Sequence, residues 1–230
     1  MRDILAEIVA KKRDIVAAAK RSVPLDELKS TLSCGTFRMA EHFRWRGWGL
    51  IAECKLQSPA KGRLTRSYSV TEFADIYAAA GAAVISVHTD PHFLGSNEDF
   101  AAVRARVDTP LLRKDFIIDP YQVYEARALG ADAVLLIVRI LTPEELRQLL
   151  YLTWSLGMDA LVEVHDRKDI EIAQGTPAEF IGINNRNLVT FETSVETTLD
   201  LLSHADKNRT IISESGIFTR ADAARVYEAG

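Results

Sequence analysis

The sequence contains few cysteines, no long apolar run and no strong excess of either charge. Cys34 and Cys54 do not have the spacing of a metal site or a redox motif, so they indicate a reduced, cytoplasmic protein. No apolar stretch reaches the length of a membrane span, and charges in residues 1–13 interrupt the apolar core that a signal peptide requires. The net charge of -4, from 28 basic and 32 acidic residues, argues against nonspecific nucleic-acid binding. Such binding requires a basic face.

Seven short apolar runs are the main positive feature of the chain. Continuous runs of this kind are typical of parallel strands that are buried on both faces. They lie at 50–55, 83–88, 111–115, 133–138, 160–166, 180–187 and 210–215. Helical stretches separate them, and four of these helices are predicted to end at Gly81, Gly130, Gly157 and Gly175. Alternating strands and helices with short connections predict a parallel sheet with right-handed crossovers.

Two architectures have this order, an open doubly wound sheet and a (βα)8 barrel. The turn after the first strand, residues 56–62, contains no G-x-G-x-x-G sequence, which disfavours an open nucleotide-binding sheet. Polar residues at many strand ends favour the closed TIM barrel, in which all of these ends meet at one mouth. We expect a helical extension over residues 1–49, packed on a barrel formed by residues 50–230. Gly230 resembles the other helix stops, so we expect this chain to lack the eighth βα unit.

Charged and amide residues gather at the predicted carboxyl ends of the strands. Glu53 and Lys55 alternate around Cys54, so both point to the barrel interior while Cys54 points toward the covering helices. The full set is Glu53, Lys55, Lys114, Glu163, Asn184, Arg186 and Glu214. Lysines and carboxylates that meet at one mouth form a coupled network with perturbed pKa values, which suits general acid–base catalysis. The competing interpretation is a buried network with a structural role only.

Other features are weaker signals. Ser215-Gly216, after the seventh strand, is a candidate phosphate site, because glycine lets backbone N–H groups approach a ligand. The loop over 56–69 carries Lys61, Arg63 and Arg66 and is either a binding loop or a basic surface loop. His88, His92 and His165 are too scattered for a metal site, so none is predicted. We expect Trp45, Trp48 and Trp154 to pack in the core or against helices.

Six ordered motifs resemble the indole-3-glycerol phosphate synthase family from about residue 50 to the end of the chain. They are Ile51-Ala52-Glu53-Cys54-Lys55-Leu56-Gln57-Ser58-Pro59, Ile85-Ser86-Val87 with Thr89-Asp90, Leu112-Arg113-Lys114-Asp115-Phe116-Ile117, Leu161-Val162-Glu163-Val164-His165, Ile181-Gly182-Ile183-Asn184-Asn185-Arg186-Asn187-Leu188 and Ser213-Glu214-Ser215-Gly216-Ile217. The helical extension also fits this family. Two positions depart from it, because His88 stands where leucine is common and Lys55-Leu56-Gln57 replaces a more basic stretch.

The resemblance implies a lyase of tryptophan biosynthesis that needs neither cofactor nor metal. It would convert 1-(2-carboxyphenylamino)-1-deoxyribulose 5-phosphate into indole-3-glycerol phosphate, carbon dioxide and water. By similarity, Lys114 is the general acid, Glu163 transfers protons during dehydration, and Glu53 and Asn184 hold the reacting groups. Lys55, Ser58, Arg186, Glu214, Ser215 and Gly216 match positions near the substrate, while Phe93 and Phe116 would form an apolar wall for the aromatic ring. The implied protein is a cytoplasmic monomer or weak homo-oligomer whose partner is a phosphorylated small molecule, with no nucleic acid or membrane.

Two alternatives remain open. One is another phosphate-binding barrel enzyme of amino-acid synthesis, such as an isomerase of tryptophan or histidine synthesis, which Glu53, Lys55, Lys114 and Glu163 together disfavour. The other is a C-terminally truncated barrel that is weakly active or binds ligand without turnover.

Overall fold

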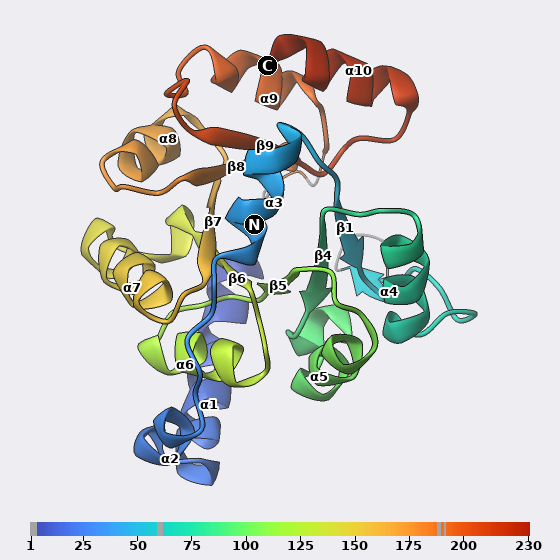
Figure 1. Ribbon diagram of the computed structural model, residues 1–230. Coiled ribbons are helices and arrows are strands. Elements are labelled where there is room, and N and C mark those ends of the chain that lie inside the picture. Colours follow the sequence, from blue (N-terminus) through green and yellow to red (C-terminus); the bar gives the residue numbers. More distant parts are fainter. Residues whose placement is uncertain (1–3, 59–61, 188–189, 191) are drawn as a thin grey trace.

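The computed structural model describes residues 4–58, 62–187, 190 and 192–230. Pro59, Lys61 and Leu188, which belong to the motifs and loop discussed above, lie outside the described residues. Seven parallel strands form one curled sheet, with helices around its outer face (Figure 1). In sheet order they are β1 (Ile51–Cys54), β4 (Val84–His88), β5 (Leu111–Lys114), β6 (Ala133–Ile137), β7 (Asp159–Val164), β8 (Phe180–Asn184) and β9 (Thr210–Glu214). All seven predicted strands are confirmed, and β1 and β9 do not pair with each other in the described part of the chain.

Each strand is followed by a helix that packs on the outside of the sheet. These helices are α4 (Val70–Ala79), α5 (Asn97–Arg106), α6 (Pro120–Ala128), α7 (Pro143–Ser155), α8 (Arg167–Gln174), α9 (Glu196–Leu202) and α10 (Arg220–Ala229). Short 3-10 turns, η1 (Pro91–Phe93) and η2 (Val138–Ile140), follow β4 and β6, and a small hairpin of β2 (Gln57–Ser58) and β3 (Gly62–Arg63) follows β1. Capping boxes begin α4, α7 and α10, because Ser69, Thr142 and Thr219 each pair with an acid three residues later.

The apolar core has two parts, one on each face of the sheet. The outer part lies between the sheet and the helices, and there Cys54 packs with Val70 and Ala74 of α4, as its alternation with Glu53 predicted. The inner part fills the barrel and includes Leu112 and Phe180. Because the strands are buried on both faces, they read in the sequence as continuous apolar runs.

The N-terminal segment forms three helices. Helix α1 (Ile4–Ser22) and helix α2 (Leu25–Ser30) lie beside α6. Helix α3 (Arg38–Arg46) places Met39 and Phe43 against the inner core. The division into residues 1–49 and 50–230 stays a prediction. No helix in the described ranges is long and apolar enough to cross a membrane.

The expectation for one of the three tryptophans was wrong, because Trp45 has 83% of its surface exposed. Trp48 is 66% exposed but packs against a helix, since its ring meets that of Tyr227 in α10 edge to face with 6.0 Å between the centroids. Trp45 is exposed because α3 directs Met39 and Phe43 inward, which leaves Trp45 off the buried face. Trp154 is partly buried against the outer core, in agreement with the prediction.

Candidate active site

Lys114 at the end of β5 lies at the centre of a charged cluster. Its Nζ atom is 3.1 Å from Oε2 of Glu214 on β9 and 3.4 Å from Oε2 of Glu163 on β7. These residues come from alternate strands, whose side chains share a layer inside a parallel barrel. The structure therefore brings together three of the residues that the sequence placed at strand ends.

Glu53 extends the cluster toward β1 and β4. Its carboxylate forms an ion pair with Lys55, and its Oε2 atom lies 3.2 Å from Nε2 of His88. The buried ring of His88 stacks on Phe93, with 4.4 Å between the ring centroids. His88 was not predicted as a site residue, although histidine stands here where the family commonly has leucine. Its position two residues after the inward-facing Ser86, in register with Lys114, is the signal that would have placed it in the site.

Two residues of the β8 end, Asn184 and Arg186, lie beside Glu163. The side chain of Asn184 hydrogen-bonds Glu163, and its Oδ1 atom accepts the backbone N–H of Arg186 at 3.0 Å. Nε of Arg186 is buried and has no hydrogen-bond partner among the described residues. Asn184 therefore orients both the carboxylate of Glu163 and the backbone of Arg186.

His165 supports Glu163 from behind. Its Nε2 atom is 3.2 Å from Oε1 of Glu163, and its Nδ1 atom is 3.6 Å from Oδ2 of Asp169, which also accepts from Nε of Arg139 at 3.0 Å. Burial lowers the pKa of His165, but hydrogen bonds to Asp169 and Glu163 outweigh this effect and raise it. His165 lies just beyond the strand. It was not predicted as a site residue.

The cluster shifts the pKa of each of its central members. Burial opposes the charge on Lys114, but Glu214, Glu163 and Glu53 outweigh it and raise the pKa of the ammonium. Burial also opposes ionisation of Glu163, yet Lys114 and His165 hold its pKa below the ordinary value. Glu214 behaves differently, because burial and the nearby charge of Glu163 outweigh Lys114 and raise its pKa to about 7. The ammonium group of Lys114 therefore contacts the ionised carboxylate of Glu163 and the carboxyl group of Glu214, which holds its proton near neutral pH.

Glu53 remains ionised despite its burial. Burial raises the pKa of this carboxyl group, but His88, Lys114 and Lys55 together bring it well below its ordinary value. Glu53 is therefore a fixed negative charge beside the cluster, available to hold a cationic or hydrogen-bond-donating group.

An aromatic pair lies beside the charges. Phe93 in η1 and Phe116 after β5 have ring centroids 6.2 Å apart and an interplanar angle of 29°. Both rings are only partly buried, so they offer an apolar surface. The structure therefore places the two predicted ring-binding residues side by side.

The remaining predicted binding residues lie at the edges of this region. Ser215 and Gly216 have positive φ angles of 64° and 76°, and the Ser215 carbonyl accepts from Nδ2 of Asn185 at 3.0 Å. A Cβ atom on Gly216 would lie 2.6 Å from Cγ2 of Thr193, so this close turn requires glycine. Ser58 is buried in β2, and the adjacent Gln57 donates to the carbonyl of His92, next to Phe93.

The chain matches the family model described as indole-3-glycerol phosphate synthase over residues 5–230. It belongs to the indole-3-glycerol phosphate synthase family. A relative from Bordetella pertussis named indole-3-glycerol phosphate synthase is 45% identical over 235 residues, which covers 99% of this chain and 90% of the relative. A second, from Burkholderia multivorans, is 46% identical over 230 residues and covers 96% and 87%.

A solved structure of another enzyme shows the same fold as this family member. The N-acetylmannosamine-6-phosphate 2-epimerase from Clostridium perfringens superposes with a TM-score of 0.60 at 14% identity, over 79% of this chain and 82% of that one. At this identity the likeness concerns the fold only. No group of three His, Cys, Asp or Glu residues that could hold a metal ion occurs in the described part of this synthase-family chain.

Proposed function

We propose that this chain is an indole-3-glycerol phosphate synthase. It would close the indole ring of 1-(2-carboxyphenylamino)-1-deoxyribulose 5-phosphate and release carbon dioxide and water. The observation that carries the proposal is the position of Lys114, held between Glu163 and Glu214 at the mouth of the barrel that also carries Phe93 and Phe116. Family membership over nearly the whole chain supports the same reaction. The cytoplasmic location and a monomeric or weakly oligomeric state stay predictions.

The first chemical step requires an acid near the ketone oxygen and an apolar slot for the ring. Phe93 and Phe116 hold the aromatic ring so that its carboxylate-bearing carbon faces the ketone carbon. The new carbon–carbon bond forms as Lys114 gives a proton to the ketone oxygen, which becomes a hydroxyl group. The raised pKa of Lys114 keeps the ammonium protonated until that oxygen becomes basic.

The later steps restore the aromatic system. Loss of carbon dioxide returns the bonding electrons to the ring, and the apolar surroundings favour this step because they remove water from the carboxylate. Lys114 has by then given up one proton, and the Glu214 carboxyl group beside it reprotonates it and regains a proton from solvent. The hydroxyl group leaves as water with this second proton from Lys114, while the ionised Glu163 accepts the proton that a carbon atom loses as the new double bond forms. Asn184 and His165 hold Glu163 in place for this transfer.

Cationic groups suit the substrate's anionic parts. Lys55 and Arg186 lie on the β1 and β8 sides of the cluster, where they can bind the carboxylate or hydroxyl groups of the substrate. Ser215, Gly216 and Ser58 are proposed as the phosphate side of the site, because the left-handed turn after β9 presents backbone groups.

The direct test is turnover of the proposed substrate. Purified protein is mixed with 1-(2-carboxyphenylamino)-1-deoxyribulose 5-phosphate, and the fluorescence of the indole product is followed together with carbon dioxide release. We expect both signals in equal amounts. Fluorescence and carbon dioxide both absent from folded protein would contradict the proposal. Conversion of N-(5-phosphoribosyl)anthranilate instead would support the isomerase alternative.

A further inference from the structure

Helix α1 carries one lysine on its buried face. Ile8, Lys12 and Val16 are the buried residues of this helix, spaced four apart. Lys12 is only 2% exposed, although lysine is almost never fully buried unless it is paired. Its neighbour Lys11 is exposed on the same helix. The position of Lys12 therefore calls for a buried anionic partner.

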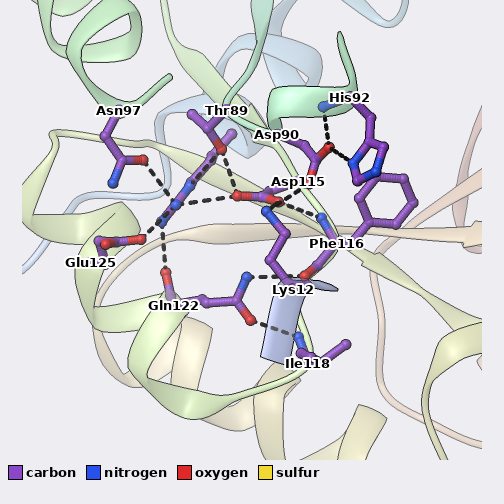
Figure 2. Close-up of polar contacts among 11 residues, drawn as sticks. Lys12, Thr89, Asp90, His92, Asn97, Asp115, Phe116, Ile118, Gln122 and Glu125 are labelled. Carbon is purple, nitrogen blue, oxygen red and sulfur yellow. Dashed lines mark hydrogen bonds and ion pairs between the residues drawn. The ribbon is translucent and has the colours of Figure 1, made fainter. Parts of the chain in front are cut away.

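Two buried carboxylates meet the ammonium group of Lys12. Nζ lies 2.8 Å from Oδ2 of Asp90 and 2.5 Å from Oδ1 of Asp115 (Figure 2). Asp90 follows β4 and Asp115 follows β5, so one side chain from the N-terminal helix joins the ends of two neighbouring strands. Without that charge, Arg113 would still pair with Asp115 at 3.2 Å, but Oδ2 of the buried Asp90 would have no cation beside it among the described residues, which is costly.

Each carboxylate in turn fixes the backbone beside an aromatic ring of the site. Oδ1 of Asp90 accepts the backbone N–H of His92 at 2.8 Å and so caps η1, which contains Phe93. Oδ1 of Asp115 accepts the backbone N–H of Phe116 at 2.7 Å. Both bonds are visible in Figure 2. The two carboxylates that pair with Lys12 therefore hold the backbone of Phe116 and of His92, the residue before Phe93.

The rest of the network holds Asp115 from its other side. Oδ2 of Asp115 accepts from the hydroxyl of Thr89 at 2.7 Å and from Arg113 at 3.2 Å. Gln122 accepts the N–H of Ile118 and donates to the carbonyl of Phe116, at 2.9 and 3.0 Å. On Asp90, the ring Nδ1 atom of His92 lies 2.8 Å from Oδ1, and Lys12 is the only cation paired with Oδ2 among the described residues.

We propose that Lys12 is a positioning residue of the reaction, which holds the Phe93–Phe116 wall in place by neutralising Asp90 and Asp115. This proposal rests on the proposed function, since the wall matters only if it binds the aromatic ring of the substrate. Lys12 touches no reacting group and acts through the two carboxylates. The N-terminal helix thus takes part in ring binding, although none of its residues belongs to the cluster around Lys114.

The test compares Lys12→Met with Lys11→Met, which removes a neighbouring exposed charge. We expect kcat/KM of Lys12→Met to fall about 10- to 100-fold, mainly through a higher KM, because a small displacement of a positioning group has an effect of this size. Lys11→Met should match the wild type. A purely structural role would instead lower the active fraction and leave KM unchanged, and that outcome would overturn the proposal.

Two further measurements separate this proposal from the proposed function. Amide hydrogen exchange at His92 and Phe116 should become faster in Lys12→Met relative to the amides of β8, whether or not the protein turns over. Unchanged exchange overturns the role of Lys12, whereas absent turnover in the wild type overturns the proposed function.

The double variant Lys12→Met/Asp90→Asn removes one buried carboxylate along with the ammonium and should recover part of the loss in kcat/KM. Lys12→Met/Asp14→Asn, which changes an exposed acid of the same helix, should recover none.

Discussion

Oε1 of Glu214 occupies the space that a Cβ atom on Gly182 would need. The two residues lie on the neighbouring strands β8 and β9, and Cδ1 of Leu161 closes the same space from the other side, 3.1 Å from the Cβ position. Glycine at position 182 therefore makes room for a carboxyl group that contacts Lys114 at 3.1 Å. Gly182, a residue of the sixth-strand motif, thus shapes the charged cluster because it has no side chain.

Gly182→Ala should displace Glu214 from Lys114. The added methyl group would overlap Oε1 of Glu214 and lie 3.1 Å from Cδ1 of Leu161, so the carboxyl group of Glu214 must move. We expect kcat to fall about 10-fold or more while the protein remains folded. Turnover kinetics and thermal unfolding check this result. Gly175→Ala at the end of α8, where the new atom would meet two carbonyl oxygens at 3.3 and 3.6 Å, is the matched control. Equal activity of the two variants would contradict the role of this space.

The pH profile of kcat/KM should contain an ionisation from Glu214. Its pKa is raised to about 7, so the carboxyl group loses its proton as the pH rises through neutrality. The new negative charge holds the Lys114 proton more tightly and makes Lys114 a weaker acid. We therefore expect kcat/KM to decline above about pH 7 in the wild type. Glu214→Gln should remove this decline, and a decline that persists in that variant would assign the ionisation to another group.

Asp159 should make the protein less stable at alkaline pH. It is buried at the start of β7, accepts the N–H of Ala40 at 3.0 Å, and has a pKa raised to about 6, mainly by burial. A raised pKa in the folded state means that folding favours the protonated form, so the destabilisation is complete above about pH 6 and disappears below about pH 4. Asp159→Asn should therefore raise the free energy of unfolding at pH 8 by up to about 3 kcal/mol, with little effect at pH 4.

Urea unfolding at both pH values measures this difference. Asp26→Asn, which changes an exposed acid on α2, should give the same small change at each pH. If Asp159→Asn changed the free energy of unfolding equally at both pH values, burial of the ionised carboxylate beside α3 would not destabilise the fold, and the prediction would be contradicted.

The strands and their polar ends could be predicted because both depend on local patterns. A strand buried on both faces must be apolar throughout, so Glu163 at the end of such a run was a clear signal. The convergence of these ends follows from parallel topology. Helix α3 has no side-chain cap of its own, and its first turn is capped instead by Asp159, more than a hundred residues away. Tertiary contacts of this kind leave no local signal.

Lys12 shows a second limit of the same kind. The apolar residues around it have the spacing of an amphipathic surface helix, so from the sequence the lysine is one more charge on that surface. Its spacing, midway between Ile8 and Val16, was the available signal, but its partners Asp90 and Asp115 come from strands far along the chain. A buried ion pair can be recognised only when the positions of both residues in the fold are known.

The central claim is that Lys114 is the acid for ring closure. The most direct measurement is single-turnover formation of the fluorescent indole product by Lys114→Met and Lys114→Arg, compared with Lys168→Met at an exposed position. Arginine keeps the positive charge between Glu163 and Glu214 but does not release its proton. Both Lys114 variants should lose about 10²- to 10⁴-fold in rate, while Lys168→Met keeps the wild-type rate. Undiminished product formation by folded Lys114→Arg would contradict the assignment of Lys114 as the acid.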